Sequence, residues 1–127
     1  MPVQFLSDEW SAELNQRLNA DEEFKESILN KSAKLLQVIS GGDGERRYWI
    51  RIEDGTIALG LGDMDGADAT ITEDYDTAVG LATGQLNAVS AFMSGKLKIS
   101  GNMMLLMQLQ SALSGLPRVM QEMDVDY

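Results

Sequence analysis

Two runs of alternating apolar side chains flank Asp54–Gly55, and they constrain the fold more strongly than any other feature of the sequence. In each run every second residue is apolar, as in a strand with one buried face. The apolar positions are Tyr48, Ile50 and Ile52 before the turn and Ile57, Leu59 and Leu61 after it. Asp-Gly is a strong signal for a tight two-residue turn. The sequence therefore predicts a β-hairpin that joins Arg46–Ile52 to Thr56–Leu61.

The rest of the chain alternates between segments with strand periodicity and segments with helical periodicity. Three further strands are predicted, at Ala33–Ile39, Ala67–Thr72 and Lys96–Ser100. Helices are predicted at Asp8–Leu18, at about Asp21–Leu29, from Tyr75 to Gly84, between Asn87 and Gly95, and from Asn102 to about Leu113. The tail beyond Pro117 is predicted to be either a short docked helix or a frayed end. These elements indicate a single α+β domain over residues 1–127.

Two residue types are absent from the sequence, and their absence narrows the function. Without cysteine there is no disulfide and no thiolate metal site, and without histidine there is no Ser-His-Asp triad. A net charge of -10 argues against a nucleic-acid partner. The first residues lack the pattern of a secretory signal, and no segment is apolar enough to span a membrane. We therefore expect a cytoplasmic protein.

Three local motifs that suggest ion binding or catalysis are better explained as turns and caps. Asp63–Asp68 resembles a calcium loop, but its glycine falls at the fourth position and no glutamate follows at the twelfth. Gly95-Lys96 resembles the end of a P-loop, but the required Ser or Thr does not follow. Asp74, Tyr75 and Asp76 could form a carboxylate–phenol pair, but acids ahead of a helix more often cap it. We therefore predict no metal and no catalytic residue.

The segment after Gly101 is rich in methionine, whose flexible and polarizable side chain fits irregular apolar surfaces. A stripe at helical spacing is typical of ordinary core, and it comprises Met103, Leu106, Met107 and Leu109. Met104 and Leu105 fall outside this stripe, so the helix is apolar nearly all round its first two turns. Such a helix is either covered on more than one side or lines a cavity, and the periodicity leaves both open.

Three blocks of the sequence resemble the sterol carrier protein type-2 domain family. They are Ala67–Thr72, Leu81–Asn87 and Ala91–Asn102, in the family's order and spacing, with looser similarity from about Ser32 to Leu113. The resemblance implies a five-stranded, mostly antiparallel sheet with about five helices packed on one side, enclosing an apolar tunnel. It also implies broad binding of fatty acids, acyl-CoA thioesters, phospholipids or sterols, without a cofactor.

Our first hypothesis is a non-catalytic protein that binds a lipid or other hydrophobic small molecule in such a tunnel, with lipid transfer as an additional role that the sequence leaves open. It would have at most transient contact with a membrane surface. The candidate lining residues are Trp49, Ile71, Leu81, Phe92, Met93, Met103, Met104 and Met107. Two alternatives stay open: an interaction or regulatory module with a filled core, and a small enzyme that uses a buried carboxylate on a hydrophobic substrate. The sequence does not identify the ligand, the tunnel opening or the oligomeric state, with a homodimer among the options.

Overall fold

The predicted strands form one mixed sheet in the computed structural model, which describes residues 2–41 and 44–127, with the backbone alone at 88 and 89. Its strands are β2 (Ser32–Ser40), β3 (Arg46–Glu53), β4 (Thr56–Leu61), β5 (Ala69–Asp74) and β6 (Leu97–Gly101). Their order in the sheet is β4-β3-β2-β5-β6. The pairing of β2 with β5 is parallel, and the other pairings are antiparallel. The α+β class and the mostly antiparallel five-stranded sheet are therefore confirmed.

One face of this sheet carries the apolar side chains that the alternation predicts, and we call it the core face. The register places a row of side chains across it: Ile99, Ile71, Gln37, Tyr48 and Leu61. The next row, towards the C-terminal end of β5, contains Leu97, Glu73, Ile39 and Arg46. Leu35 and Ile50 of the preceding row are fully buried, so this face supplies the floor of the hydrophobic core.

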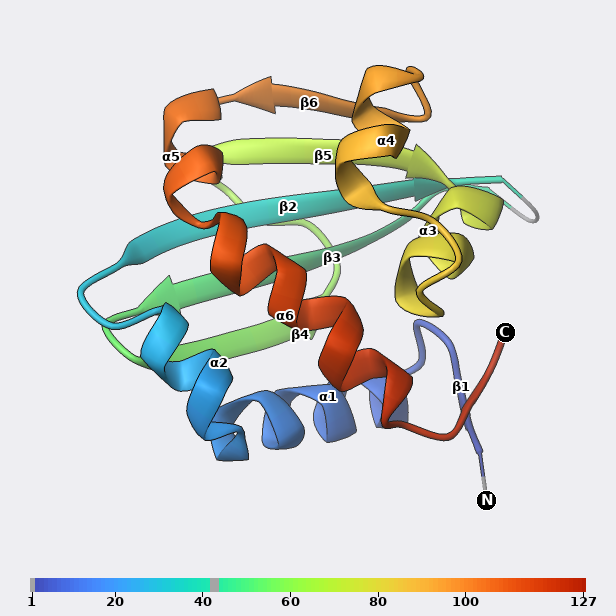
Figure 1. Cartoon of the computed structure of the whole chain (residues 1–127). Coiled ribbons are helices and arrows are strands. Elements are labelled where there is room, and N and C mark those ends of the chain that lie inside the picture. The colour runs from blue at the N-terminus through green and yellow to red at the C-terminus, as the bar shows by residue number, and fades with distance from the viewer. Residues whose placement is uncertain (1, 42–43) are drawn as a thin grey trace.

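Helices cover the core face, so the molecule has two main layers (Figure 1). Within the described residues they are α1 (Asp8–Ala20), α2 (Glu22–Ser27), α3 (Tyr75–Ala82), α4 (Ala88–Met93), α5 (Met103–Gln108) and α6 (Gln110–Gln121). α1 packs against β4, and α6 runs diagonally across the sheet in contact with α1, α2 and α3. Side-chain caps begin three of these helices: oxygens of Ser7, Asp74 and Asn102 accept hydrogen bonds from the N–H groups of Trp10, Thr77 and Leu105.

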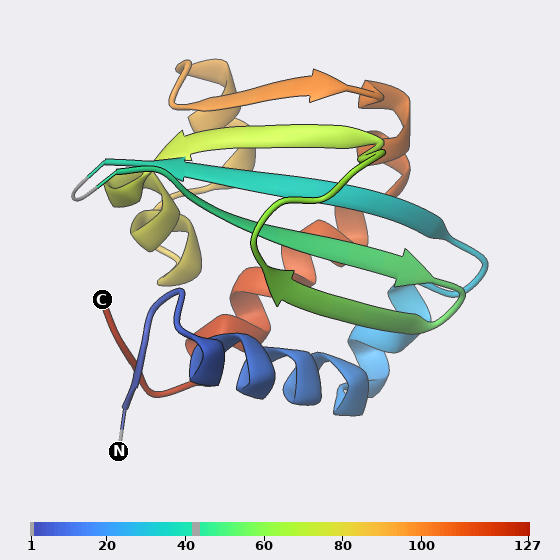
Figure 2. The same ribbon diagram turned by 180° about the vertical axis from the view of Figure 1, so that it is seen from behind.

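The opposite face of the sheet, which we call the outer face, is crossed by the connection from β4 to β5 (Figure 2). Trp49 lies on this face, because it alternates with Tyr48 and Ile50 of the core face. The Arg51 guanidinium carbon lies 6.0 Å from the centroid of the Trp49 ring. A Cβ at Gly60 would lie 2.5 Å from that ring, so a glycine on β4 allows the indole to pack against the strand.

The helix expected from Asn102 to Leu113 is in fact two helices that meet at Leu109, which is a correction to the prediction. Leu109 is fully buried, and its N–H is shared between the carbonyls of Leu105 and Leu106, at 3.0 and 3.2 Å. Such a shared bond is common at a helix terminus. The break lets α6 change direction and bury its own apolar face.

The C-terminal tail docks, which decides between the two expectations for it. α6 continues through Pro117, and the apolar side chains of Val119, Met120 and Met123 are buried. Beyond α6, β7 (Val125–Asp126) pairs in parallel with β1 (Val3–Gln4). Neither two-residue strand was predicted, because two residues are too few to show an alternation.

Candidate functional site

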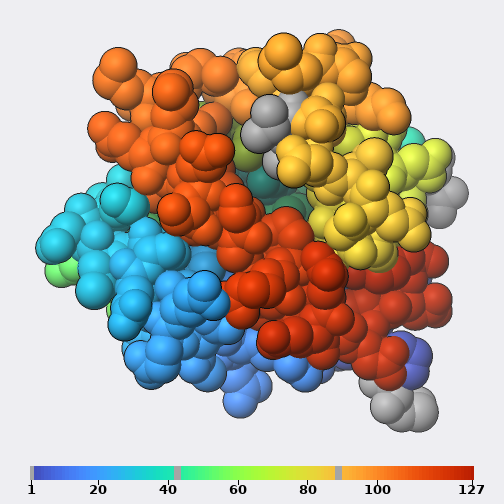
Figure 3. Space-filling view, viewed as in Figure 1, coloured from blue at the N-terminus to red at the C-terminus, as the bar shows by residue number. Residues whose placement is uncertain are grey.

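The helical layer leaves part of the core face uncovered. Figure 3 shows a hollow between α3 and α4 on one side and α5 and α6 on the other, with β2 and β5 at its floor. A ligand that enters this hollow would lie between the sheet and the helices. In the described structure this is the place where the tunnel implied by the sequence resemblance would open.

The floor of the hollow combines apolar and polar side chains. β5 contributes Ile71 and Glu73 to the core face, and β2 contributes Gln37 beside Ile71. Tyr48 is the neighbour of Gln37 on β3, outside this floor, and its ring packs against Trp10 of α1 with the ring centroids 5.4 Å apart. All four residues are less than a tenth exposed. The hollow therefore leads to a floor that offers hydrogen-bonding groups as well as apolar surface.

Glu73 is the charged member of this floor. The residue is 6% exposed, and its Oε2 is buried without a hydrogen-bond partner among the described residues. Burial raises the pKa of Glu73 to about 7, and the negative charge of the adjacent Asp74 adds to the rise. Burial also raises the pKa of the Tyr48 phenol, and the Glu73 charge adds to this rise. A carboxyl group that exchanges its proton near neutral pH therefore lies beneath the helices.

One wall of the hollow is formed by the side of α6 that faces away from α2. The α2 side is identified by Gly115, whose added Cβ would lie 3.1 Å from Phe24, and by Arg118, which pairs with Asp21. Leu113 precedes Gly115 by two residues and so points to nearly the opposite side of the helix. It is half-buried against the core. Leu113 is therefore a wall residue that the sequence analysis did not select.

Apolar side chains are exposed on the two helices at either end of β6, and we call them the apolar rim. They are Phe92 and Met93 of α4 and Met103, Met104 and Met107 of α5. Met93, Met104 and Met107 are 79%, 71% and 74% exposed, which is unusual for side chains of this size. α4 and α5 border the hollow (Figures 1 and 3), so the rim lies beside its opening.

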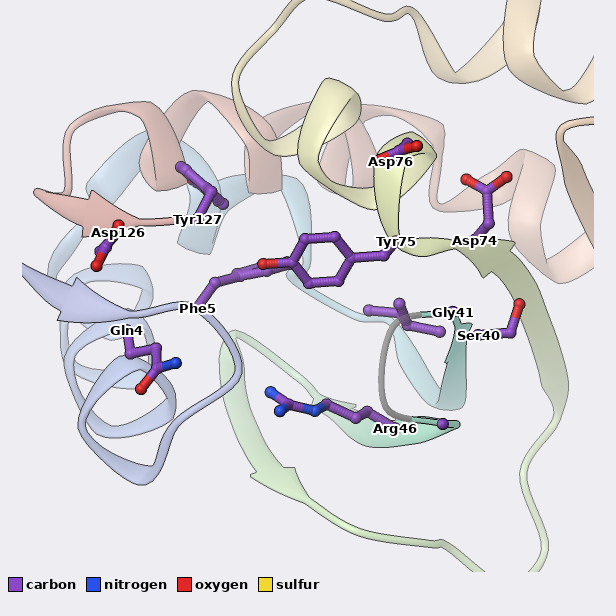
Figure 4. Close-up of a pocket in the computed structure, with 12 residues that line it drawn as sticks. Gln4, Phe5, Ser40, Gly41, Arg46, Asp74, Tyr75, Asp76, Asp126 and Tyr127 are labelled. Carbon is purple, nitrogen blue, oxygen red and sulfur yellow. The ribbon is translucent and has the colours of Figure 1, made fainter.

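A second pocket, of about 460 Å³, lies at the far end of the sheet between the chain termini and the start of α3 (Figure 4). The Tyr75 ring projects into it between Phe5 and the Arg46 side chain. Asp74, Asp76 and Asp126 also line it, so its surface combines carboxylates with aromatic rings. The Phe5 and Tyr75 ring centroids are 5.8 Å apart, and this contact holds the N-terminal segment against α3.

The model of the SCP-2 sterol transfer family matches residues 12–114. The chain belongs to this family. Sterol carrier protein 2 of Rattus norvegicus is 39% identical over 102 residues, which cover 78% of this chain and 18% of that protein. The chain thus spans about a fifth of the length of that relative.

Solved structures of the SCP-2 family share the fold. A crystal structure of sterol carrier protein 2 aligns with a TM-score of 0.82 and 19% identity, covering 94% of this chain and 99% of that one. A solution structure of the sterol carrier protein domain 2 of Helicoverpa armigera aligns with a TM-score of 0.67 and 26% identity, covering 96% and 93%. These alignments include the helices on the core face as well as the sheet.

The structure distributes the predicted lining residues of this SCP-2 domain over three environments. Ile71 is buried at the floor of the hollow, and Leu81 is half-buried on α3. The apolar rim contains Phe92, Met93, Met103, Met104 and Met107. Trp49 is not brought together with the others, because strand alternation turns its ring to the outer face. The ligand contacts of all these residues remain predictions.

Sequence reasoning did not select Gln37, Glu73 or Leu113 as site residues. The signal for Glu73 was present, because Ala69, Ile71 and Glu73 alternate on one face of β5. The strand was predicted to end at Thr72, so Glu73 fell outside it. Among the described residues, no group of His, Cys, Asp and Glu side chains could hold a metal ion, and no helix is long and apolar enough to cross a membrane.

Proposed function

We propose that this chain binds lipids or other hydrophobic small molecules in the hollow between the core face and helices α3–α6. The observation that carries the proposal is an opening in the helical layer above a mainly apolar sheet face, in a chain of the SCP-2 sterol transfer family. Burial of apolar ligand surface would supply the affinity, at roughly 25 cal/mol per Å² before ordering costs.

The apolar rim supports a role in transfer as well as in binding. A lipid that leaves a membrane must pass from one apolar surface to another, and the flexible methionine side chains of α5 can adapt to ligands of different shape. Met93, Met104 and Met107 are exposed on α4 and α5, the two helices that border the opening, so a lipid or a membrane surface that approaches these helices would meet them first. Their contact with a membrane would be brief, since the chain carries a net charge of -10.

A tryptophan at Leu113 tests the location of the site. Leu113→Trp adds an indole to the wall of the hollow, and we expect it to weaken dodecanoate binding by about tenfold or more, because the space for the chain is filled. Ser114→Trp is the matched control, since Ser114 is exposed on the same helix. Isothermal titration calorimetry measures both affinities, and the circular dichroism spectrum reports folding. Equal affinity in two folded variants would place the site elsewhere.

The chemical identity of the ligand recovered after the same titration distinguishes binding from catalysis. Glu73 is a buried carboxyl group with a raised pKa, which is what the enzyme hypothesis required. Recovery of the unaltered ligand after long incubation supports binding, whereas recovery of a chemically altered ligand would support an enzyme. A protein that takes up no ligand at all would support the interaction module with a filled core.

A further inference from the structure

Two buried polar side chains of the core face, Gln37 and Glu73, mark one corner of the floor of the hollow, which β2 and β5 form. The other polar side chains of this face lie outside that corner, because the Tyr48 ring packs against Trp10 of α1 and Arg46 is exposed on β3, two strands from Glu73 in the same row. Gln37 pairs directly with Tyr48, and Glu73 lies one row further along β5 from Ile71, the partner of Gln37 on that strand. Leu35, Ile39 and Ile50 around them are apolar and buried. This corner can therefore recognise one polar group on an otherwise apolar ligand.

The Glu73 carboxyl group lacks a hydrogen-bond partner at Oε2 among the described residues. A buried polar atom without a partner is costly, and the cost is recovered when a donor arrives. A carboxylate oxygen can accept a hydrogen bond from a hydroxyl or an amine of a ligand. A ligand carboxylate or phosphate at the same point would instead place two negative charges close together in a medium of low dielectric constant.

We propose that Glu73 makes the hollow selective for lipids whose buried end carries a hydrogen-bond donor, such as a hydroxyl group, over lipids that bury an anionic end. This inference rests on the proposed function. It concerns only the end of the ligand that reaches β5, and an anionic head group at the apolar rim is compatible with it. The ligand class is therefore a long-chain alcohol or a lipid with a hydroxyl group far from its head group.

Three ligands with the same twelve-carbon chain test the inference: dodecanoate, 12-hydroxydodecanoate and dodecanedioate. The first carboxylate can remain at the rim in each ligand, so the ligands differ only at the buried end. At pH 8 the wild-type chain should bind the hydroxy acid about tenfold more tightly than dodecanoate, and the diacid more weakly than either. Calorimetry on the full chain gives the three dissociation constants.

Two substitutions of Glu73 separate its charge from its hydrogen bond. Glu73→Leu removes both, and we expect its preference to reverse, so that dodecanoate binds about tenfold more tightly than the hydroxy acid. Glu73→Gln keeps a hydrogen-bonding group without the charge. This variant should therefore retain the affinity for the hydroxy acid and bind the diacid more tightly than the wild type does. Glu53→Gln is the matched control, since Glu53 is exposed at the end of β3. It should leave all three affinities unchanged.

The outcomes distinguish this inference from the proposed function. If Glu73→Leu binds the ligands but keeps the wild-type preference, the proposed role of Glu73 is wrong, whereas the proposed lipid site is still supported. If no variant and not even the wild type binds any of the three, the proposed function fails, and the inference fails with it. A reversed preference in Glu73→Leu alone supports both.

Discussion

Glu73 has its carboxyl group in the interior, on the same face of β5 as Ala69 and Ile71. Ionisation there is unfavourable because the charge loses its contact with water. The folded chain therefore holds the Glu73 proton to a higher pH than the unfolded chain does. The consequence is a dependence of stability on pH that belongs to this one residue.

Stability should fall as the pH rises through the range between the two pKa values of Glu73. The ordinary value of 4.5 applies to the unfolded chain and a value of about 7 to the folded chain. Between them the folded state binds more protons, so the free energy of unfolding decreases with pH and levels off above about 7. The full loss is about 3 kcal/mol.

Glu73→Gln isolates this contribution, because all other titrating groups are shared with the wild type. The variant should be more stable than the wild type at pH 8, by up to about 3 kcal/mol, and the difference should shrink towards pH 5. Urea unfolding at pH 5, 6, 7 and 8 measures both chains. A difference that does not change with pH would show that Glu73 is not held protonated by the fold.

At the scale of elements, the periodicity of apolar residues was sufficient to predict the strands of the sheet. The alternating runs at Arg46–Glu53 and Thr56–Leu61 form the predicted hairpin, and the register of β2 to β6 follows the predicted faces. The burial of individual helix side chains was harder to predict, since periodicity does not say how closely another element packs against a helix. Periodicity left core and cavity lining open for Met104 and Met107, whereas both side chains are exposed on α5.

Local signals were misleading where tertiary packing opposed them. The strand was predicted to end at Thr72, yet β5 continues to Asp74: Glu73 is its last buried residue, and Asp74 is the cap of α3. Pro117 reads as a helix stop, yet α6 continues because Val119 and Met120 bury their side chains on the core. The proposed site depends on these two tertiary outcomes, so the residue patterns alone could not locate it.

The junction of β6 and α5 depends on Gly101. Its φ is +103°, and a Cβ would lie 2.5 Å from the Asp68 carbonyl oxygen and 2.9 Å from the Ala69 Cα. These are backbone atoms that pair β5 with β6, so they cannot move aside cheaply. Gly101→Ala should lower the free energy of unfolding by about 3 kcal/mol, through strain and a clash together.

Gly95→Ala is the control for strain alone. Gly95 also has a positive φ, of +81°, but nothing lies within 4 Å of its added Cβ. Gly95→Ala should lower the free energy of unfolding by about 1 kcal/mol. Thermal unfolding ranks the two variants, and equal losses would contradict the close approach of β5 to Gly101.

At the scale of the whole molecule, the sheet layer and the helical layer differ in how completely they are closed. The sheet is continuous and its core face is closely packed under α1 and α6, whereas the helical layer opens between α3–α4 and α5–α6 (Figure 3). A ligand bound there would join the two halves of the helical layer. It would bind the folded chain and not the unfolded chain, so it should raise the unfolding temperature in proportion to its occupancy.

The central claim is that the hollow holds a lipid, and native mass spectrometry of the purified full chain tests it most directly. We expect a species heavier than the bare chain by the mass of an intact lipid, which organic extraction removes and added 12-hydroxydodecanoate replaces in equimolar amount. The bare mass alone, both after gentle purification and after addition of an excess of this ligand, would contradict the account.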